Sequence, residues 1–269
     1  MPVHWLQPVG GIFIKMCIRD SFFDIDGTLA TGLTTVMPES GARCLERLRA
    51  NGHFTAIATG RLQASAAVVA QRYGFTHIVA DGGYSLTLDG EVIEMQSLPV
   101  TDCVALLDRL ERQRVPWAVT LENERVCLTA DERYLAVAPS NYFPVTVDPA
   151  FDYRGMDKLY KVYIACTPEN QGEIDLGGLP TVRYNQDVLF IEPVCKQRGI
   201  RRMLDVLGVP DEDVAVFGDG TNDVCMFGQG WLSVAMGNAC AALKEKADYI
   251  TTSVDQDGLW NACRHFGWI

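Results

Sequence analysis

The sequence lacks the cysteine and histidine patterns that bind zinc in proteins. Its nine cysteines include no Cys-x-x-Cys pair, and its four histidines have no spacing that would pair them with a cysteine or with each other as ligands. The odd number of cysteines also argues against a disulfide framework. We therefore expect reduced thiols, a cytoplasmic location and no zinc site.

Long hydrophobic runs are missing as well. The run from Gly10 to Ile14 is too short to cross a membrane, no lysine or arginine precedes it, and no small-residue cleavage site follows it. These features predict neither a membrane span nor a signal peptide. The sequence also contains no internal repeat and no low-complexity segment.

Positive charge is scarce. The chain has 34 acidic residues against 23 basic ones, which gives a formal net charge of −11. This charge argues against nucleic acid or an anionic membrane as the main partner, because both are themselves negatively charged. An anionic substrate would need local positive groups to bind.

What the sequence does contain is two aspartate-rich segments almost two hundred residues apart. The first reads FFDIDGTL and contains Asp24 and Asp26, and the second reads VFGDGTND and contains Asp219 and Asp223. Each is an apolar run that turns into carboxylates and glycines, as expected where a buried parallel strand ends in a functional loop. The carboxyl ends of parallel strands lie at one edge of a sheet, so the two segments can meet there. Converging carboxylates repel one another unless a cation lies among them, and an all-oxygen group favours Mg²⁺.

From Pro38 onward the sequence alternates between helix-like and strand-like segments. Helices are predicted around residues 45–48, at 63–73, at 104–112 and at 200–207, and strands at 55–59, 78–80, 117–120, 126–129, 159–165 and 214–217. Between Gly83 and Phe190 the pattern changes to hairpin-like signals, and strand-helix alternation resumes afterwards. We therefore predict an α/β fold: a Rossmann-like parallel-sheet core with an inserted α/β domain.

The predicted boundaries follow from these changes in pattern. The core covers residues 21–82 and 191–269, and the insertion covers residues 83–190. Residues 1–20 are predicted to be an atypical leader outside the fold, since a strand buried on both faces should not begin with charged residues. Met16 is then an alternative natural start.

Four ordered motifs resemble those of the haloacid dehalogenase-like hydrolase superfamily. They are DIDGT from Asp24, ATGR from Ala58, Lys196 at the start of a predicted helix, and GDGTND from Gly218. The long insertion between the second and third motifs resembles the Cof-type branch, subfamily IIB, whose cap is an α/β domain, and so do the later segments VAMGNA and ADYIT. The resemblance covers residues 22–269. It implies a Mg²⁺-dependent phosphatase that hydrolyses a small phosphorylated metabolite, such as a sugar phosphate, through an aspartyl-phosphate.

The resemblance also implies which residues carry the chemistry. Asp24 would be the nucleophile that attacks phosphorus. Asp26 would be the catalytic acid and base, which protonates the leaving group and later deprotonates water. Mg²⁺ would be held by Asp24, by the backbone carbonyl of Asp26 and by Asp219.

The remaining motif residues would bind the phosphoryl group. In the family pattern this task maps to Thr59, Gly60, Lys196 and Asn222, which offer hydrogen-bond donors and one ammonium group. Asp223 would lie behind them and steady Lys196 and the metal-bound waters.

Two other functions stay open at this point. One is a phosphomutase of the same superfamily, which would need a bisphosphorylated activator. The other is a catalytically silent regulator that binds a phosphorylated metabolite, although such a protein would be expected to have lost the catalytic aspartates or Lys196. The chain also has Asp81-Gly82-Gly83 where the branch commonly has Asn-Gly-Ala, and a carboxylate at the mouth of the site could alter substrate choice. We expect a monomer or a weak homodimer.

Overall fold

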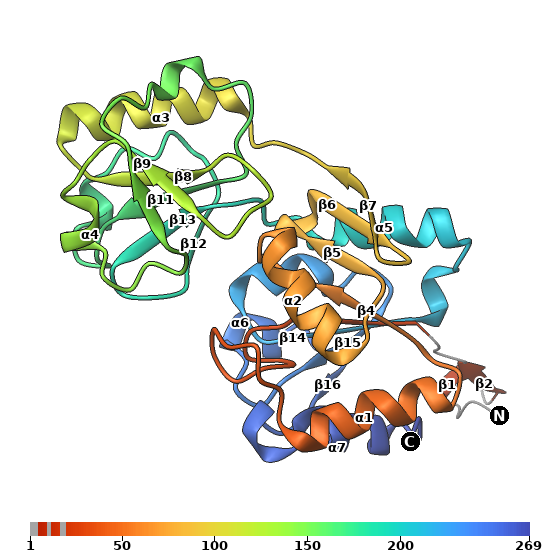
Figure 1. Cartoon of the computed structure of the whole chain (residues 1–269). Coiled ribbons are helices and arrows are strands. Elements are labelled where there is room, and N and C mark those ends of the chain that lie inside the picture. Colours follow the sequence, from red (N-terminus) through yellow and green to blue (C-terminus); the bar gives the residue numbers. More distant parts are fainter. Residues whose placement is uncertain (1–4, 10–11, 17–19) are drawn as a thin grey trace. The chain divides into compact units, whose positions relative to one another are not determined.

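A computed structural model describes residues 5–9, 12–16 and 20–269 of the chain (Figure 1). The chain divides into two compact units. Unit 1 contains the described residues up to 61, residues 66–94 and residues 194–269. Unit 2 contains residues 62–65 and 95–193.

Unit 1 is built on an eight-stranded sheet with the strand order β16-β15-β14-β3-β4-β5-β6-β7. The bounds of its strands are β3 Asp20–Phe23, β4 Phe54–Ala58, β5 Ile78–Ala80, β6 Ser85–Leu88, β7 Glu91–Met95, β14 Val214–Gly218, β15 Leu232–Ala235 and β16 Tyr249–Ile250. The strands from β16 to β5 run parallel, and β6 joins β5 antiparallel. Because β3 and β14 are neighbours, the two aspartate-rich segments leave the sheet side by side.

Helices cover both faces of this sheet, which explains why its central parallel strands are mostly hydrophobic. On one face Phe23, Ile57 and Phe217 pack with helices α1 (Glu39–Ala50), α2 (Gln63–Tyr73) and α7 (Gly258–His265). On the other face Phe22 and Val216 pack with α5 (Lys196–Leu207) and α6 (Ala241–Lys244). Successive side chains of a strand point to opposite faces, so each buried strand supplies both cores.

The helices and strands predicted for this unit are confirmed. Helix α2 covers the predicted residues, and β4, β5 and β14 agree with the predicted strands to within one residue at each end. Helix α5 ends where Gly208 adopts the left-handed conformation (φ 66°) and its N–H bonds to the carbonyl of Leu204. Glycine is the usual residue at such a helix end.

Unit 2 is a six-stranded sheet with the strand order β10-β9-β8-β11-β13-β12. The bounds of its strands are β8 Trp117–Thr120, β9 Cys127–Thr129, β10 Val145–Val147, β11 Lys161–Ala165, β12 Thr181–Arg183 and β13 Val188–Ile191. Helix α3 (Val100–Gln113) packs against Val119, Val162 and Ile164 on one face. The opposite face packs Tyr163 against α4 (Tyr134–Val137). The α/β character predicted for this part of the chain is confirmed.

The predicted limits of the insertion need correction. We placed its start at residue 83 and its end at residue 190, whereas unit 2 runs from Met95 to Pro193. The strands β6 and β7 lie in the sheet of unit 1, because β6 pairs with β5. The alternating sequence of these strands indicates a hairpin, but it does not specify which sheet the hairpin joins.

The N-terminal boundary also moves. Asp20, which we assigned to the leader, is the first residue of β3 and pairs with Phe54 and Val214 in the neighbouring strands. It is buried together with Ser21, so β3 begins with polar residues. Of the predicted leader, the structure further describes the backbone of β1 (Trp5–Val9) and β2 (Ile12–Met16), which pair antiparallel. The rest of residues 1–20 lies outside the described residues.

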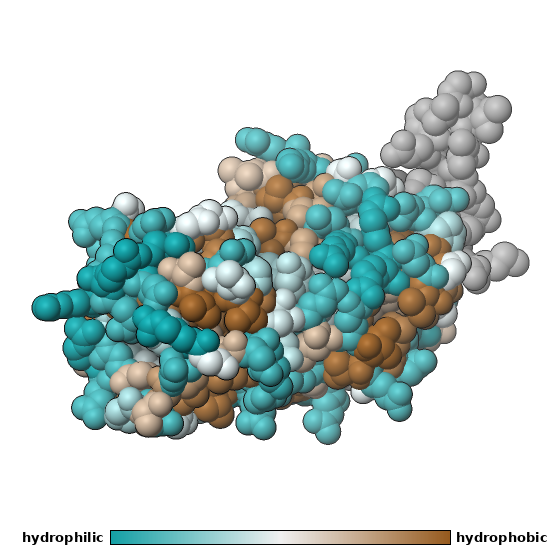
Figure 2. All heavy atoms as spheres, turned by 90° about the horizontal axis from the view of Figure 1, so that it is seen from above, coloured by the Kyte–Doolittle hydropathy of each residue, from teal (hydrophilic) through white to brown (hydrophobic). Residues whose placement is uncertain are grey.

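Hydrophobic side chains reach the surface in small groups. On the face shown in Figure 2, hydrophobic residues form separate patches between hydrophilic ones. The large hydrophobic residues that are most exposed include Val36, Ile93 and Val206. Scattered exposure of this kind is normal for a globular protein. Among the residues described, no helix has both the length and the apolar composition to cross a membrane.

Candidate functional site

Three loops of unit 1 begin at the carboxyl ends of adjacent parallel strands. Asp24 follows β3, Asp219 follows β14 and Thr59 follows β4. The N–H of Asp24 donates to the carbonyl of Phe217 at 3.0 Å, which extends the pairing of β3 with β14 up to the site. This is the edge at which open α/β sheets bind their ligands.

Three carboxylates meet at this edge. One oxygen each of Asp24, Asp219 and Asp223 lies within 4.8 Å of the other two, and in the described part of the chain this is the group of acidic, histidine or cysteine side chains that could hold a metal ion. The prediction that the two aspartate-rich segments meet at this edge is confirmed by this distance. That Asp24 and Asp219 share a cation stays a prediction. Asp24 and Asp223 are buried, and Asp219 is half-buried.

Lys196 lies among these carboxylates. Its Nζ donates to Oδ1 of Asp24 and to Oδ1 of Asp223, both at 2.6 Å, and its side chain is 0% exposed. Burial lowers the pKa of Lys196, but the charges of Asp223 and Asp24 outweigh burial and hold it above its ordinary value. The lysine is therefore protonated across the physiological range.

A close backbone contact sets the position of Lys196. The N–H of Cys195, just before α5, donates to the carbonyl of Gly82 at 3.0 Å. The next residue, Gly83, has φ +106°, and a side chain there would lie 2.8 Å from the carbonyl carbon of Cys195. The glycines of the Asp81-Gly82-Gly83 segment thus let α5 begin beside the sheet edge.

The electrostatics of the group match a divalent cation. Burial and the charge of Asp223 raise the pKa of Asp24 well above its ordinary value, and Lys196 offsets only part of this. Burial and the charge of Asp223 likewise raise the pKa of Asp219 to about 7. Once all three are ionised, three carboxylates beside one ammonium leave two negative charges, which a divalent cation would balance. An all-oxygen donor set suits a hard ion such as Mg²⁺ or Mn²⁺.

Hydrogen bonds from the backbone and from neighbouring side chains hold Asp219 and Asp223 in place. The backbone N–H of Asp219 and that of Gly220 each donate to Oδ2 of Asp223 at 2.9 Å. Asp219 accepts bonds from Thr28 Oγ1 at 3.2 Å and from Asn238 Nδ2 at 3.1 Å. Asn238 also donates to the carbonyl of Gly27 at 2.8 Å, so it links the two aspartate-rich loops.

The Asp26 side chain does not belong to this group. Its carboxylate forms a bidentate ion pair with Arg61, with bonds of 2.9 Å from Nε and 2.5 Å from Nη2. The sequence assigned its backbone carbonyl, not its carboxylate, to the metal, and that assignment stays a prediction.

The predicted phosphate-binding residues lie in two places. Thr59 and Gly60 are buried directly after β4, and Thr59 Oγ1 accepts the N–H of Arg61 at 3.1 Å. Asn222 precedes Asp223 in the short 3-10 helix η5 (Thr221–Met226). Asp81, expected at the mouth of the site, is only 2% exposed and has φ +50°. The phosphate contacts of these residues stay predictions.

The sequence interpretation missed three residues of the site: Thr28, Arg61 and Asn238. Each lies inside one of the segments that resemble the family, in DIDGT, ATGR and VAMGNA respectively. The signal was therefore present, but a motif does not show which side chain each of its members contacts.

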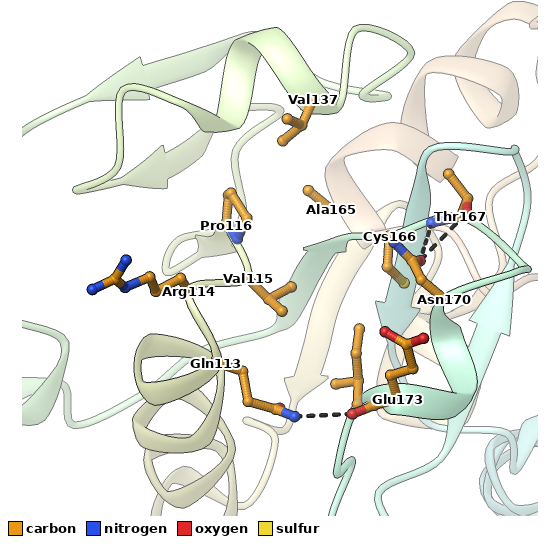
Figure 3. A pocket seen from close by; sticks show the side chains of 11 residues that line it. Gln113, Arg114, Val115, Pro116, Val137, Ala165, Cys166, Thr167, Asn170 and Glu173 are labelled. Atoms are coloured by element: carbon orange, nitrogen blue, oxygen red, sulfur yellow. Dashed lines mark hydrogen bonds between the residues drawn. The ribbon is translucent and has the colours of Figure 1, made fainter.

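Unit 2 contains a separate cavity of about 500 Å³ (Figure 3). It is lined by Val115 and Pro116 after α3, by Cys166 after β11, and by the exposed side chains of Asn170 and Glu173. The side chain of Gln113 donates to the backbone carbonyl of Glu173 at one side. None of the carboxylates of the site lines this cavity, so we do not assign it to the chemistry.

The chain belongs to the haloacid dehalogenase-like hydrolases, because the model of that family matches residues 21–263. YkrA, a candidate phosphatase of Bacillus subtilis, is 28% identical over 257 residues that cover 91% of this chain and 96% of YkrA. A candidate bifunctional phosphatase and peptidyl-prolyl cis-trans isomerase of Streptococcus pyogenes is 29% identical over 261 residues. That match covers 94% of this chain but only 54% of the length of the relative.

Solved structures agree with this assignment. A hypothetical protein from Geobacillus kaustophilus has a TM-score of 0.79 at 28% identity, over 93% of this chain and 99% of that one. BT4131, a sugar phosphatase of subclass IIB, has a TM-score of 0.76 at 26% identity, over 93% of this chain and 100% of that one. The family and these relatives define the class of enzyme: a phosphatase, which hydrolyses phosphoric monoesters of small molecules.

Proposed function

We propose that the chain is a Mg²⁺-dependent phosphatase that hydrolyses a small phosphorylated metabolite, with sugar phosphates as the substrate class, through an aspartyl-phosphate on Asp24. The observation that carries the proposal is the position of Lys196, which bonds to Asp24 and Asp223 within a group of three carboxylates. A buried lysine held against a carboxylate at the end of a parallel strand places a positive charge where an anionic phosphoryl group must approach an anionic nucleophile.

Asp24 supplies the nucleophile. One of its oxygens forms a bond to phosphorus while the bond from phosphorus to the leaving oxygen breaks. The ammonium of Lys196 remains beside Asp24 and reduces the repulsion between the two anions. When bound by Asp24, Asp219 and the Asp26 carbonyl, Mg²⁺ would neutralise charge on the nucleophile and the phosphoryl oxygens.

Asp26 moves the protons. Its carboxyl group gives a proton to the leaving oxygen, and its carboxylate then takes a proton from the water that attacks the aspartyl-phosphate. Thr59, Gly60, Lys196 and Asn222 donate hydrogen bonds to the phosphoryl oxygens in this proposal. Phosphate monoesters hydrolyse among the slowest of uncatalysed reactions, and the enzyme must lower the barrier by roughly 20 kcal/mol or more.

The substrate class rests on two relatives. BT4131 is a sugar phosphatase. YitU of Bacillus subtilis, 26% identical over 260 residues, is a 5-amino-6-(5-phospho-D-ribitylamino)uracil phosphatase, whose name includes a phosphorylated sugar-alcohol chain. Both support a leaving group that is a polyhydroxylated alcohol. We further propose that the protein is cytoplasmic and that it is a monomer or a weak homodimer. Sedimentation velocity over a range of protein concentrations would test the oligomeric state.

Phosphate release from a panel of esters tests the proposal. We would assay sugar phosphates, nucleotides and pyridoxal phosphate with Mg²⁺, with EDTA, and with Mg²⁺ restored after EDTA. Hydrolysis of a sugar phosphate that disappears in EDTA and returns with Mg²⁺ is the expected result. Conversion between sugar phosphate isomers that needs a sugar bisphosphate would favour a phosphomutase. Binding of phosphorylated metabolites without turnover of any ester would favour a silent regulator.

Replacing Gly27 with alanine should weaken Mg²⁺ binding. Gly27 has φ +81°, and a methyl group there would lie 2.5 Å from Cγ of Asp219, which must move. Loss of a group that only orients a metal ligand typically costs about 10- to 100-fold in affinity, and displacing the proposed ligand Asp219 should cost at least as much. Isothermal titration of the metal-free protein with Mg²⁺ measures the effect.

Gly52→Ala is the matched control for this variant. Gly52 has φ +83°, so alanine there is equally strained, but nothing lies within 4 Å of the added methyl group. It should bind Mg²⁺ as the wild type does. Equal affinities in all three proteins would mean that Asp219 is not a ligand.

Exchanging residues 95–193 for the corresponding segment of YkrA should change which phosphate esters are cleaved and leave Mg²⁺ dependence unaltered. We propose unit 2 as the cap that contacts the variable leaving group, while unit 1 contacts the phosphoryl group common to all substrates. Circular dichroism and cooperative melting would verify that the chimera folds. A folded chimera that keeps the parent's ranking of substrates would place selectivity in unit 1.

A further inference from the structure

The side chain of Arg61 fixes the orientation of the Asp26 carboxylate. Nε donates to Oδ2 at 2.9 Å and Nη2 donates to Oδ1 at 2.5 Å, while Nη2 also donates to the carbonyl of Thr34 at 2.6 Å. The Arg61 side chain is 4% exposed and the Asp26 side chain 15%. Two parallel charge-assisted bonds between planar groups define an orientation that a single contact would not.

Arg61 is itself anchored at its backbone. Its N–H donates to Oγ1 of Thr59 at 3.1 Å, and its carbonyl accepts the N–H of Asp81 at 2.8 Å. The guanidinium therefore extends from a segment that is bonded on both sides. It joins the loop after β3 to the loop after β4.

This ion pair separates Asp26 from the other carboxylates. Asp26 lies two residues after Asp24, and its charge acts on both Asp24 and Asp219. Its carboxylate nevertheless stays outside the group that Asp24, Asp219 and Asp223 form. A carboxylate released by Arg61 would be attracted to Lys196 or to a bound cation instead.

We propose that Arg61 is a positioning residue, which keeps the Asp26 carboxylate away from the cation group and oriented for proton transfer. The inference rests on the proposed function of Asp26 as acid and base. A carboxylate offers about four lone-pair sites, of which Arg61 uses two, so sites remain for the transferred proton. In the first step that proton passes to the leaving oxygen as its bond to phosphorus breaks, and in the second the attacking water returns one to Asp26.

The dependence of rate on the leaving group tests the proposal. An alkyl leaving group needs a proton, whereas p-nitrophenolate leaves without one. In Arg61→Gln, kcat/KM for an alkyl phosphate such as glycerol 2-phosphate should fall by about 10²-fold, since misplaced catalytic groups and lost general acids each cost this much. For p-nitrophenyl phosphate it should fall by less than about threefold, because the contribution of general acid catalysis is then small.

A double-mutant cycle shows whether Arg61 acts through Asp26. Asp26→Asn alone should show the same leaving-group signature, and adding Arg61→Gln to it should change kcat/KM no further. If Arg61 binds the phosphoryl group directly, the two losses will multiply and both substrates will be affected equally. That outcome would overturn the proposal.

Two further variants complete the experiment. Arg61→Lys keeps the charge but not the fork, so it should behave like Arg61→Gln, and wild-type rates in this variant would contradict the proposal. Arg49→Gln is the control, because Arg49 also donates to a threonine and a carbonyl, Thr55 and Tyr73, but near the amino end of β4. It should retain wild-type rates with both esters.

The failure of the inference can be distinguished from failure of the proposed function. If Asp26→Asn shows no leaving-group dependence, Asp26 is not the acid and the proposed mechanism is wrong. If Asp26→Asn shows it and Arg61→Gln does not, the mechanism stands and only the role of Arg61 is wrong.

Discussion

Replacing Asp24 with asparagine should abolish phosphatase turnover, with a loss on the order of 10⁴-fold or more, as found when other enzymes lose a nucleophile. An amide is not an anionic nucleophile and cannot form the acyl phosphate. Asparagine is nearly isosteric, and its Oδ1 can still accept the bond from Lys196 Nζ that now measures 2.6 Å. Lys196 also keeps its ion pair with Asp223, so its charge stays compensated and the melting temperature should change little. Steady-state kinetics and intact-mass detection of the phosphorylated protein measure the effect.

Asp205→Asn is a suitable control for this variant. Asp205 lies on the exposed side of α5, the helix that begins with Lys196. This variant should retain full activity and a phosphorylated intermediate. Mass spectrometry should also confirm that the asparagine introduced in Asp24→Asn has not deamidated to aspartate. Near-wild-type turnover in intact Asp24→Asn would reject the covalent mechanism.

Local sequence patterns predicted the parts of the fold that depend on local physics. Strands such as Val214–Gly218 are apolar runs that must be buried on both faces, and the change to carboxylates marks where each strand leaves the core. Because Asp24 and Asp219 each follow a parallel strand, the sequence alone indicated that they lie at the same edge of the sheet. That their strands β3 and β14 are neighbours is seen only in the structure. The end of helix α5 at Gly208 could also be predicted, because glycine readily adopts the left-handed conformation in which helices commonly end.

Long-range pairings could not be predicted in this way. The pairing of β6 with β5 depends on which sheet edge is available. The alternation of side chains along β6 would fit either sheet. The bond of Arg61 to Asp26 spans 35 residues, and Asn238 reaches Asp219 only because β15 returns beside β14. Motifs identified these residues as members of the site but did not determine their contacts.

Replacing Lys196 with methionine should destabilise the metal-free protein by about 3–5 kcal/mol, the usual effect of removing one partner of a buried ion pair. Methionine retains most of the side-chain volume, so the loss arises from charge. Asp24 and Asp223 would remain buried without the ammonium group, whose Nζ now lies 2.6 Å from Oδ1 of each. Activity should also be lost, because no ammonium then faces the phosphoryl group. Urea denaturation in EDTA measures the free energy of unfolding.

The destabilisation should depend on pH in a defined direction. Burial and the charge of Asp223 raise the pKa of Asp24 and, to about 7, that of Asp219, from 3.8. The folded state therefore binds more protons than the unfolded state between these values, so stability falls as pH rises through this window. Without Lys196 the repulsion between the carboxylates grows, so the free energy of unfolding falls more steeply as pH rises. The difference in free energy of unfolding between the variant and the wild type should thus be smallest at the acidic end of the window.

A second substitution separates the structural effect of Lys196 from its catalytic effect. Asp223→Asn removes a negative charge, and its amide oxygen can still accept the N–H groups of Asp219 and Gly220, which now donate to Oδ2 at 2.9 Å. In the Lys196→Met, Asp223→Asn double variant, two buried charges of opposite sign are gone together, so more than half of the lost stability should return, as replacing both partners costs far less than removing one. Turnover should not return, because Asp24 would still face the phosphate without an ammonium beside it. Recovery of both stability and turnover would mean that Lys196 serves only to neutralise Asp223.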